Sequence, residues 1–301
     1  MLLRQLEYLV ALAREEHFGR AAAACNVSQP TLSAAIRELE RELDVLIVER
    51  GQRFRGFTPE GERAVAWAGR ILADRDSLRQ EVTQSKGRLS GQLRLGAIPT
   101  ALASLGLLTR HLQQQHPELT VSLLSLSSIQ IQRGLDGFDL DAGVTYLDNE
   151  PLQHVRSLPL YRERYFLVTG DTDAFRRRRS VTWAEAATLP LCLLTPDMQN
   201  RRIVDGAFHA AGAHPRPAVE TNSILALYTH VRSGLSAVLS QASLHLLSGA
   251  RWLRALPLRE PEVRRSIGIV YADREPLTPT VRALLQAAGE VSLESQLSAE
   301  Q

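Results

Sequence analysis

A short polar run near the start of the chain carries side chains suited to reading DNA bases. Gln29 offers an amide that can pair with adenine through two hydrogen bonds, and Arg37 offers a guanidinium that suits guanine or phosphate. Pro30 and Thr31 can place apolar atoms against a thymine methyl group, and Ser33 adds a hydroxyl. Because this set is polar but little charged, we predict that these five residues read base edges in a major groove.

Two short helices joined by a tight turn would position these side chains, within residues 18–37. Ala21–Ala24 gives the first helix a small-sided face, Asn26 tolerates the left-handed backbone of a sharp turn, and Ser28 is a good N-cap. We also include Ser28 in the predicted DNA contact. A buried stripe recurs along the second helix at Leu32, Ile36, Leu39 and Leu43. An ordinary helical hairpin with a solvated face is the alternative.

A basic hairpin is expected next. Val45–Val48 and Phe54–Phe57 have the apolar content of two short strands, with a turn at Gly51 and Gln52. The tip carries three arginines, Arg50, Arg53 and Arg55. Beside a recognition helix such a hairpin is a wing that can reach phosphate or the minor groove, so we predict that all three bind DNA. The alternative is a solvated hairpin without a ligand.

A long helix is predicted from Thr58 to about Lys86. Thr58 and Pro59 supply a capping hydroxyl and a proline in the first turn. An apolar stripe follows at Ala64, Ala68, Ile71, Leu78 and Val82. A helix of this length, with outward positions that are nearly all polar, usually buries such a stripe against another helix. We therefore predict a homodimer through this helix; packing on the rest of its own chain is the alternative.

The pattern of predicted secondary structure changes after a hinge at residues 87–91. Predicted strands cover residues 92–98, 119–126, 140–144, 165–169, 191–195, 236–239 and 267–271, and predicted helices cover 102–115, 129–135, 183–187, 201–211, 224–233 and 279–288. Strands that alternate with helices indicate an α/β fold with largely parallel sheets. The number of strands is large for one sheet, so we expect two similar lobes.

Composition limits the function. Among 301 residues the net charge is only +2, so any DNA contact must come from local clusters. The two cysteines, Cys25 and Cys192, lie far apart, which argues against a disulfide framework or a metal site and fits a reducing cytosol. We find no signal peptide, no apolar run that could span a membrane, and no catalytic or phosphate-loop motif. We predict a cytoplasmic protein that is not an enzyme and has neither metal nor cofactor.

The chain closely resembles the LysR-type transcriptional regulators of bacteria. The resemblance rests on LEYLVALAREEHFGRAAAACNVSQPTLSAAIRELERELDV at residues 6–45, ER at 49–50 and TPEGE at 58–62. GLDGFDLDAGV at 134–144 and VRSGLSAVLSQ at 231–241 extend it over nearly the whole chain. The chain departs from the family's usual Gly, Leu and Phe at Asp44, Ile47 and Val48, which concerns the turn into the wing and the packing beneath it.

The resemblance implies an N-terminal all-α winged helix-turn-helix with a long linker helix, followed by a two-lobed α/β effector-binding domain like the periplasmic binding proteins of type 2. We expect these parts at residues 1–58, 59–88 and 89–301, with lobe 1 at about 92–163 and 267–301 and lobe 2 at about 164–266. The implied partners are double-stranded promoter DNA, a small-molecule co-inducer of unknown identity, and further copies in a homotetramer. A cytoplasmic small-molecule-binding protein or an enzyme with a helical dimerisation domain is the alternative reading.

The same resemblance places polar segments from the two lobes around one cleft. Four of these segments lie beyond a strand end or at a helix start, where ligands of open α/β folds bind. The candidate residues are Pro99, Thr100, Ser127, Ser128, Thr145, Thr195, Gln199, Asn200, Arg201, Asn222 and Ser223. Any single one could be only an N-cap. We expect a small, anionic metabolite in the cleft, with Arg201 or the adjacent Arg202 as its counter-charge.

Overall fold

The computed structural model describes residues 1–49, 54–84, 89–170, 175, 177–244, 250 and 252–294. The chain divides into two compact units. The first comprises residues 1–87 with 136–138, and the second comprises residues 88–135 with 139–301. In the described residues, no helix has the length and apolar character that crossing a membrane would require.

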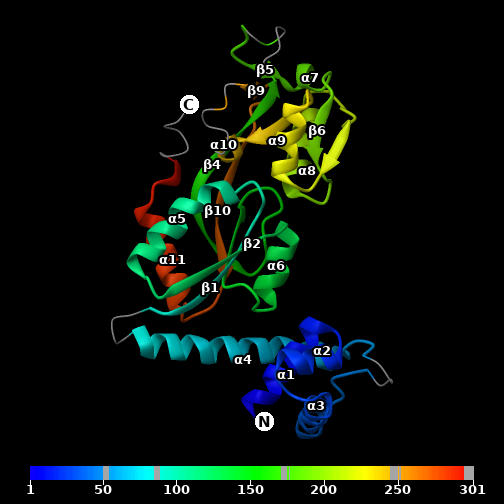
Figure 1. Ribbon diagram of the computed structural model, residues 1–301, viewed down its shortest axis with the longest axis vertical. Coiled ribbons are helices and arrows are strands. Elements are labelled where there is room, and N and C mark those ends of the chain that lie inside the picture. The colour runs from blue at the N-terminus through cyan, green and yellow to red at the C-terminus, as the bar shows by residue number, and fades with distance from the viewer. Residues whose placement is uncertain are drawn as a thin grey trace. The chain divides into compact units, whose positions relative to one another are not determined.

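Helices build the N-terminal unit. They are α1 (Leu3–Glu15), α2 (Phe18–Ala24), α3 (Gln29–Leu43) and α4 (Pro59–Gln84) (Figure 1). The predicted stripe of α3 is confirmed at Leu32, Ile36 and Leu39, which are buried, whereas Leu43 is exposed. These side chains pack against α1 and α2, and together they form the core beneath the polar face of α3.

Local hydrogen bonds fix the two turns around α2. The predicted turn at Asn26 is confirmed, because this residue has a positive φ of 55°. Ser28 caps α3, since its Oγ accepts the backbone N–H of Thr31 at 3.3 Å. His17 caps α2 in the same way: its Nδ1 accepts the N–H groups of Gly19 at 3.0 Å and Arg20 at 3.3 Å. Side-chain caps therefore fix the starts of both α2 and α3.

The segment after α3 is held from two sides. Asp44 ends α3 with the left-handed backbone that glycine usually supplies, at φ 52°. Glu40 Oε1 accepts the N–H groups of Ile47 at 2.9 Å and Val48 at 3.1 Å. Ile47 is fully buried, so the core beneath the wing is filled without the family's usual residues.

The wing is shorter than the sequence predicts. Instead of two strands, the described residues form one isolated bridge between Val48 and Phe57, next to the hydrogen bond from Glu49 N–H to the carbonyl oxygen of Gly56 at 3.1 Å. The ring of Phe54 packs edge-on against that of Phe57, with centroids 5.1 Å apart. The wing is therefore pinned by ring packing rather than by a ladder.

The apolar stripe of α4 divides into two parts. Ala68 is buried, and Ala64 and Ile71 are half-buried, in a cluster with residues of α1 and α3 from the same chain. Leu78 and Val82, farther along α4, are 65% and 57% exposed. The chain itself thus covers the first part of the predicted dimer stripe and leaves the second part open.

The C-terminal unit is built around a mixed sheet of ten strands with helices on both faces (Figure 1). The strands are β1 (Gly91–Ala97), β2 (Leu119–Ser125), β3 (Ala142–Tyr146), β4 (Val155–Gly170), β5 (Val181–Thr182), β6 (Leu191–Leu194), β7 (Val219–Thr221), β8 (Ser236–Ser240), β9 (Leu253–Arg259) and β10 (Arg264–Ala272). The helices are α5 (Leu102–Gln115), α6 (Ser128–Asp136), α7 (Trp183–Ala186), α8 (Gln199–Ala210), α9 (Ile224–Arg232), α10 (Gln241–Leu244) and α11 (Pro279–Glu290).

The strand order is β2-β1-β3-β10-β4-β8-β6-β7, with β9 beside β4 and β5 beside β9. All strands and helices predicted for this unit are present. The elements β5, β7, β9 and α10 were not predicted, and four of the nine strand pairings are antiparallel. The long strand β4 joins two halves of the unit. Its first part pairs with β10 up to Arg164, and its second part pairs with β8 and β9 from Tyr165 onward.

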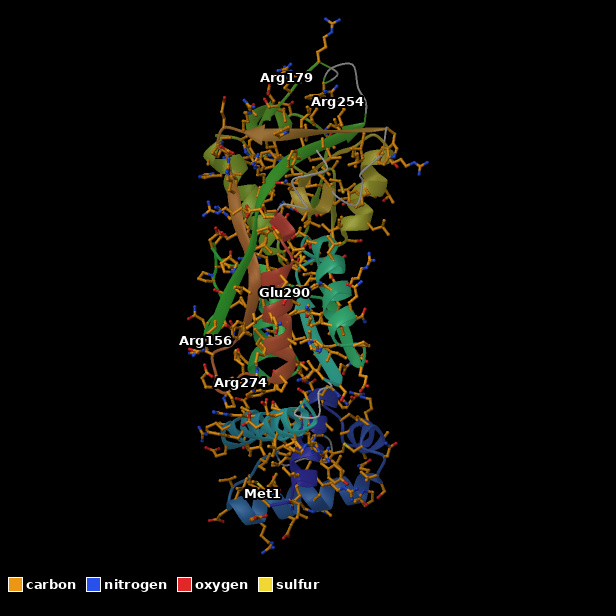
Figure 2. The ribbon with its side chains drawn as sticks, turned by 90° about the vertical axis from the view of Figure 1, so that its left-hand side faces the viewer. Met1, Arg156, Arg179, Arg254, Arg274 and Glu290 are labelled. Carbon is orange, nitrogen blue, oxygen red and sulfur yellow. The ribbon has the colours of Figure 1, made fainter. Side chains whose placement is uncertain are left out.

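Alternation of side chains along the strands buries both faces of each half. In β6, Leu191 and Leu193 face the cluster that contains α8, whereas Cys192 and Leu194 face the cluster that contains α9. At the start of β4, Arg156 is tied to the segment after β10, since it lies 2.5 Å from Asp273 and 2.7 Å from Glu275 (Figure 2). The result is a rigid frame from which the strand ends project polar loops.

Candidate functional site

The predicted recognition face is presented on the outside of α3. Gln29, Pro30, Thr31 and Arg37 are exposed, and Ser33 is half-exposed, on the face opposite the buried stripe. Ser28 is also exposed, but its hydroxyl is used in the cap and in a 2.8 Å contact with the hydroxyl of Thr31. The structure thus leaves all five predicted base-reading residues of α3 at least partly exposed. In the predicted wing, Arg55 is exposed, whereas Arg50 and Arg53 lie outside the described residues.

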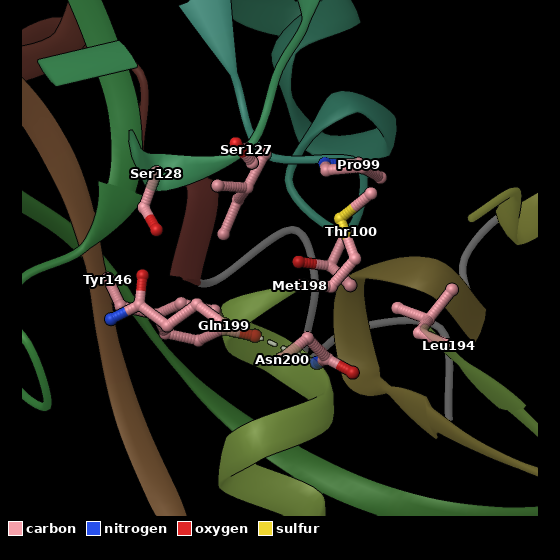
Figure 3. Close-up of a pocket in the computed structure, with 10 residues that line it drawn as sticks. Pro99, Thr100, Ser127, Ser128, Tyr146, Leu194, Met198, Gln199 and Asn200 are labelled. Carbon is pink, nitrogen blue, oxygen red and sulfur yellow. Dashed lines mark hydrogen bonds between the residues drawn. The ribbon is translucent and has the colours of Figure 1, made fainter. Parts of the chain in front are cut away.

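A cavity lies within the C-terminal unit, where strand ends meet helix starts. It measures about 240 Å³ when the space open to solvent is counted. Ten residues line it: Ile98, Pro99, Thr100, Ser127, Ser128, Tyr146, Leu194, Met198, Gln199 and Asn200. Figure 3 shows the hydroxyl groups of Thr100 and Ser128 and the amide oxygen of Gln199 directed toward the same space.

Six of the eleven predicted effector residues are brought together in this cavity: Pro99, Thr100, Ser127, Ser128, Gln199 and Asn200. The other five are not among its lining residues. Thr145 is buried beside Tyr146 in β3, and Thr195 follows Leu194 with its hydroxyl oxygen buried. Ser223 caps α9 by accepting the N–H of Ala226 at 3.4 Å, and Asn222 is exposed.

The fifth, Arg201, is buried and turned to carboxylates of its own unit. Its Nε lies 2.7 Å from Asp205, and its Nη1 lies 2.6 Å from Glu220 and 2.6 Å from the carbonyl oxygen of Leu194. The neighbouring Arg202 pairs with Glu150 through two nitrogens. The structure brings neither arginine to the cavity, because each is committed to protein acids.

Three helices begin at the cavity wall. Pro99 and Thr100 precede α5, Ser127 and Ser128 lie at the start of α6, and Met198, Gln199 and Asn200 lie at the start of α8. These helices span 14, 9 and 12 residues, so each has N-terminal N–H groups without intrahelical acceptors and a positive dipole end. The helix dipoles therefore favour negative charge at this wall, although no arginine, lysine or histidine occurs among the lining residues that the structure describes.

A buried acid lies behind the cavity and was not predicted from the sequence. Glu163 in β4 is fully buried, and its Oε2 accepts the hydroxyl of Tyr146 at 2.9 Å. Tyr146 in turn accepts the Nδ2–H of Asn200 at 2.9 Å and the hydroxyl of Tyr165 at 3.3 Å. Burial raises the pKa of Glu163 to about 7, opposed by hydrogen bonds from the hydroxyls of Ser240 and Tyr146.

A readable signal for this acid existed. Tyr161, Glu163 and Tyr165 alternate with Arg162 and Arg164, and in a strand that alternation places the glutamate on the same face as the two tyrosines. The strand predicted from the sequence starts at Tyr165 and so does not include this alternation.

Neither cysteine lines the cavity. Cys192 is fully buried in β6, and burial raises the pKa of its thiol. Cys25 is half-buried at the end of α2, and burial followed by the charge of Glu7 raises the pKa of its thiol. Because the thiolate is the reactive form, both groups are poor nucleophiles at neutral pH.

Comparison with known proteins identifies the families of the two parts of the chain. Residues 3–62 match the family described as bacterial regulatory helix-turn-helix protein, lysR family, and residues 86–292 match the LysR substrate binding domain. The chain is 34% identical to the DNA-binding transcriptional dual regulator OxyR of Escherichia coli over 95% of this chain and 94% of that protein. It is 30% identical to the hydrogen peroxide-inducible genes activator of Haemophilus influenzae over 92% of each chain.

Solved structures show the same fold over the full length. The structure of an OxyR variant from Pseudomonas aeruginosa matches with a TM-score of 0.79 at 28% identity, and covers 98% of this chain and 97% of that one. The LysR family regulator CbnR matches with a TM-score of 0.66 at 21% identity over 96% of this chain and 99% of that one, which shows the fold alone. These relatives are transcriptional regulators and not enzymes. The chain therefore belongs to the LysR family: it is a transcriptional regulator with a winged helix-turn-helix for DNA and a two-lobed domain for a small effector.

Proposed function

We propose that the cavity between the starts of α5, α6 and α8 binds a small anionic metabolite, and that this binding changes how α3 and the wing occupy promoter DNA. The convergence of three helix starts on one cavity supports the proposal. Backbone N–H groups and helix dipoles there would meet the negative charge, in place of the counter-charge expected from Arg201. A ligand that binds one arrangement of the unit more tightly shifts the protein toward that arrangement.

The relatives named as hydrogen peroxide-inducible activators suggest a redox signal as a second possibility. The two thiols of this chain favour a bound effector instead. Both have raised pKa values, and neither lies among the residues that line the described cavity. We therefore propose an effector that binds without forming a covalent bond.

Thr100→Val tests the effector site. Thr100 is 2% exposed, and its Oγ1 has no hydrogen-bond partner among the described residues. Valine keeps the shape and removes only the hydroxyl, so stability should not fall. A metabolite that raises the melting temperature of the parent protein should lose at least tenfold in affinity for the variant, measured by calorimetry.

The matched control is Thr109→Val, which removes a hydroxyl from the middle of α5, away from the lining residues. It should bind the metabolite as the parent does. Equal affinity of the parent and Thr100→Val would place the effector outside this cavity.

We propose that Gln29 reads a base. Gln29→Ala should then cost roughly 1–3 kcal/mol of binding free energy on a specific promoter site, because a pair of hydrogen bonds to a base edge is lost. Binding to random DNA should be unchanged. Fluorescence anisotropy at fixed salt measures both affinities. The probes are a fragment from the promoter region beside the gene and a shuffled version of that fragment. Equal weakening on the two fragments would show that Gln29 contacts only the backbone.

We also propose that α4 pairs two copies through its exposed part, and that two such dimers form a tetramer. Leu78 and Val82 supply an unshielded apolar surface on a helix of 26 residues. The double variant Leu78→Asp, Val82→Asp should break this contact. The molar mass measured by light scattering should therefore fall. Leu225→Asp, which changes a leucine of α9 that is 70% exposed, is the matched control and should leave the mass unchanged. An unaltered mass for the double variant would exclude α4 from the interface.

A further inference from the structure

We infer that the cavity selects an effector in which a hydroxyl or amino group lies beside the anionic group: a small hydroxy- or amino-carboxylate. This inference rests on the proposed function, and it adds the chemistry that would recognise the ligand. It follows from a side-chain oxygen that the structure leaves unpaired at the start of α8.

The acceptor is the side-chain amide oxygen of Gln199. Its Nε2 donates to the carbonyl oxygen of Asn149, which fixes the orientation of the amide. Gln199 is 3% exposed, and its Oε1 has no partner among the described residues. In Figure 3 this oxygen points into the cavity, on the side of Ser128. A buried amide oxygen without a partner costs free energy, so a ligand that donates to it gains that amount on binding.

Two donors on the floor of the cavity are already bonded to protein groups. The hydroxyl proton of Tyr146 is directed to Glu163 Oε2, and the Nδ2–H of Asn200 is directed to Tyr146 (Figure 3). Burial and the neighbouring charge of Glu163 raise the pKa of Tyr146 well above its ordinary range, so that phenol keeps its proton and its bond to the acid. The unpaired oxygen of Gln199 therefore favours a ligand group that donates at this wall.

The opposite wall has the reverse preference. Thr100 and Ser128 present hydroxyl groups beside the starts of α5 and α6, where backbone N–H groups and the dipoles favour an anion. The cavity is small, at about 240 Å³ including the space open to solvent. Both preferences must then be met by groups on adjacent atoms of a short molecule, as in a two- or three-carbon hydroxy or amino acid.

Calorimetric titration of the full-length protein with matched pairs tests the inference. The probes are acetate against glycolate and glycine, and propionate against lactate and alanine. A site built to receive a donor rejects the analogue that lacks it, because the acceptor is left buried and unpaired. We expect at least one hydroxy or amino member to bind tenfold or more tightly than its unsubstituted partner. Gln199→Met, which keeps the length and removes the acceptor, should bring the members of that pair to equal affinity.

The outcomes separate the two proposals. Equal affinity within both series of the parent protein would overturn the inference and leave an anion site in place. If none of the six probes bound at millimolar concentration, both the inference and the proposed effector cavity would be overturned. The comparison within the parent protein needs no variant, so its result stands even if Gln199→Met fails to fold.

Discussion

Replacing Gly61 with alanine is expected to unfold the N-terminal unit while the C-terminal unit stays folded. A Cβ at position 61 would lie 2.0 Å from the carbonyl oxygen of Ile47, which is far inside van der Waals contact. That carbonyl cannot move away easily. The N–H of Thr58 bonds to it at 3.0 Å, and Glu40 holds the N–H of Ile47 from the other side. Overpacking against a fixed backbone costs about 3 kcal/mol or more.

Hydrogen exchange followed by mass spectrometry checks this expectation on the full-length protein. Amides of α1, α2 and α3 should lose protection in Gly61→Ala, whereas amides of β1 and α5 should keep theirs. The matched control is Gly206→Ala in α8, where an added Cβ meets nothing within 4 Å. Alanine there should stabilise the helix by about 0.5–1 kcal/mol, since it is the better helix former. Retained protection throughout α1–α3 in Gly61→Ala would contradict the tight contact.

Glu163→Gln is expected to stabilise the protein at high pH and to do so less at low pH. The folded pKa of Glu163 is about 7, above the ordinary 4.5 of the unfolded chain. For such a group the stabilising contribution is fully present below pH 4.5 and is lost as the pH rises through 7, because the folded state must then ionise a buried acid. At about 1.4 kcal/mol for each pKa unit, the loss amounts to roughly 3 kcal/mol above pH 7.

The measurable quantity is the difference in unfolding free energy between variant and parent. It should grow by roughly 3 kcal/mol between pH 4.5 and pH 8, in the variant's favour, because glutamine does not titrate. Urea unfolding followed by fluorescence is suitable, since Trp183 is fully buried in the same unit. A difference that stays constant across this range would show that Glu163 has an ordinary pKa.

Glu262→Gln is the control for this measurement. Glu262 is an exposed carboxyl, and its hydrogen bond with Arg264 lowers its pKa. A lowered pKa stabilises the folded state above the unfolded value, so its removal should shift the difference in the opposite direction, and only slightly, because solvent screens the pair.

The parts of the structure that could be predicted depend on neighbours in sequence. The turn at Asn26 and the cap at Ser28 follow from residues within three positions, and both are confirmed. The helix starts that line the cavity could be predicted for the same reason. A polar residue between a strand and a helix usually caps the helix or binds a ligand there.

What could not be predicted depends on partners far along the chain. Arg201 looked like a ligand's counter-charge, but Glu220, nineteen residues away and beside β6 in the sheet, takes that role. Tyr146 and Glu163 meet across the strand β10 that separates β3 from β4. A helix stripe likewise does not reveal which part of it is covered by its own chain, as α4 shows at Ala68.

The sheet of the C-terminal unit, in which β10 and β4 are adjacent central strands, also has a thermodynamic consequence. One continuous apolar core contains Leu95 of β1 and Ile269 of β10 together with Leu193 of β6 and Phe208 of α8. Melting either half alone would expose side chains that the other half needs for its own burial. We therefore expect the two halves to unfold in one cooperative transition.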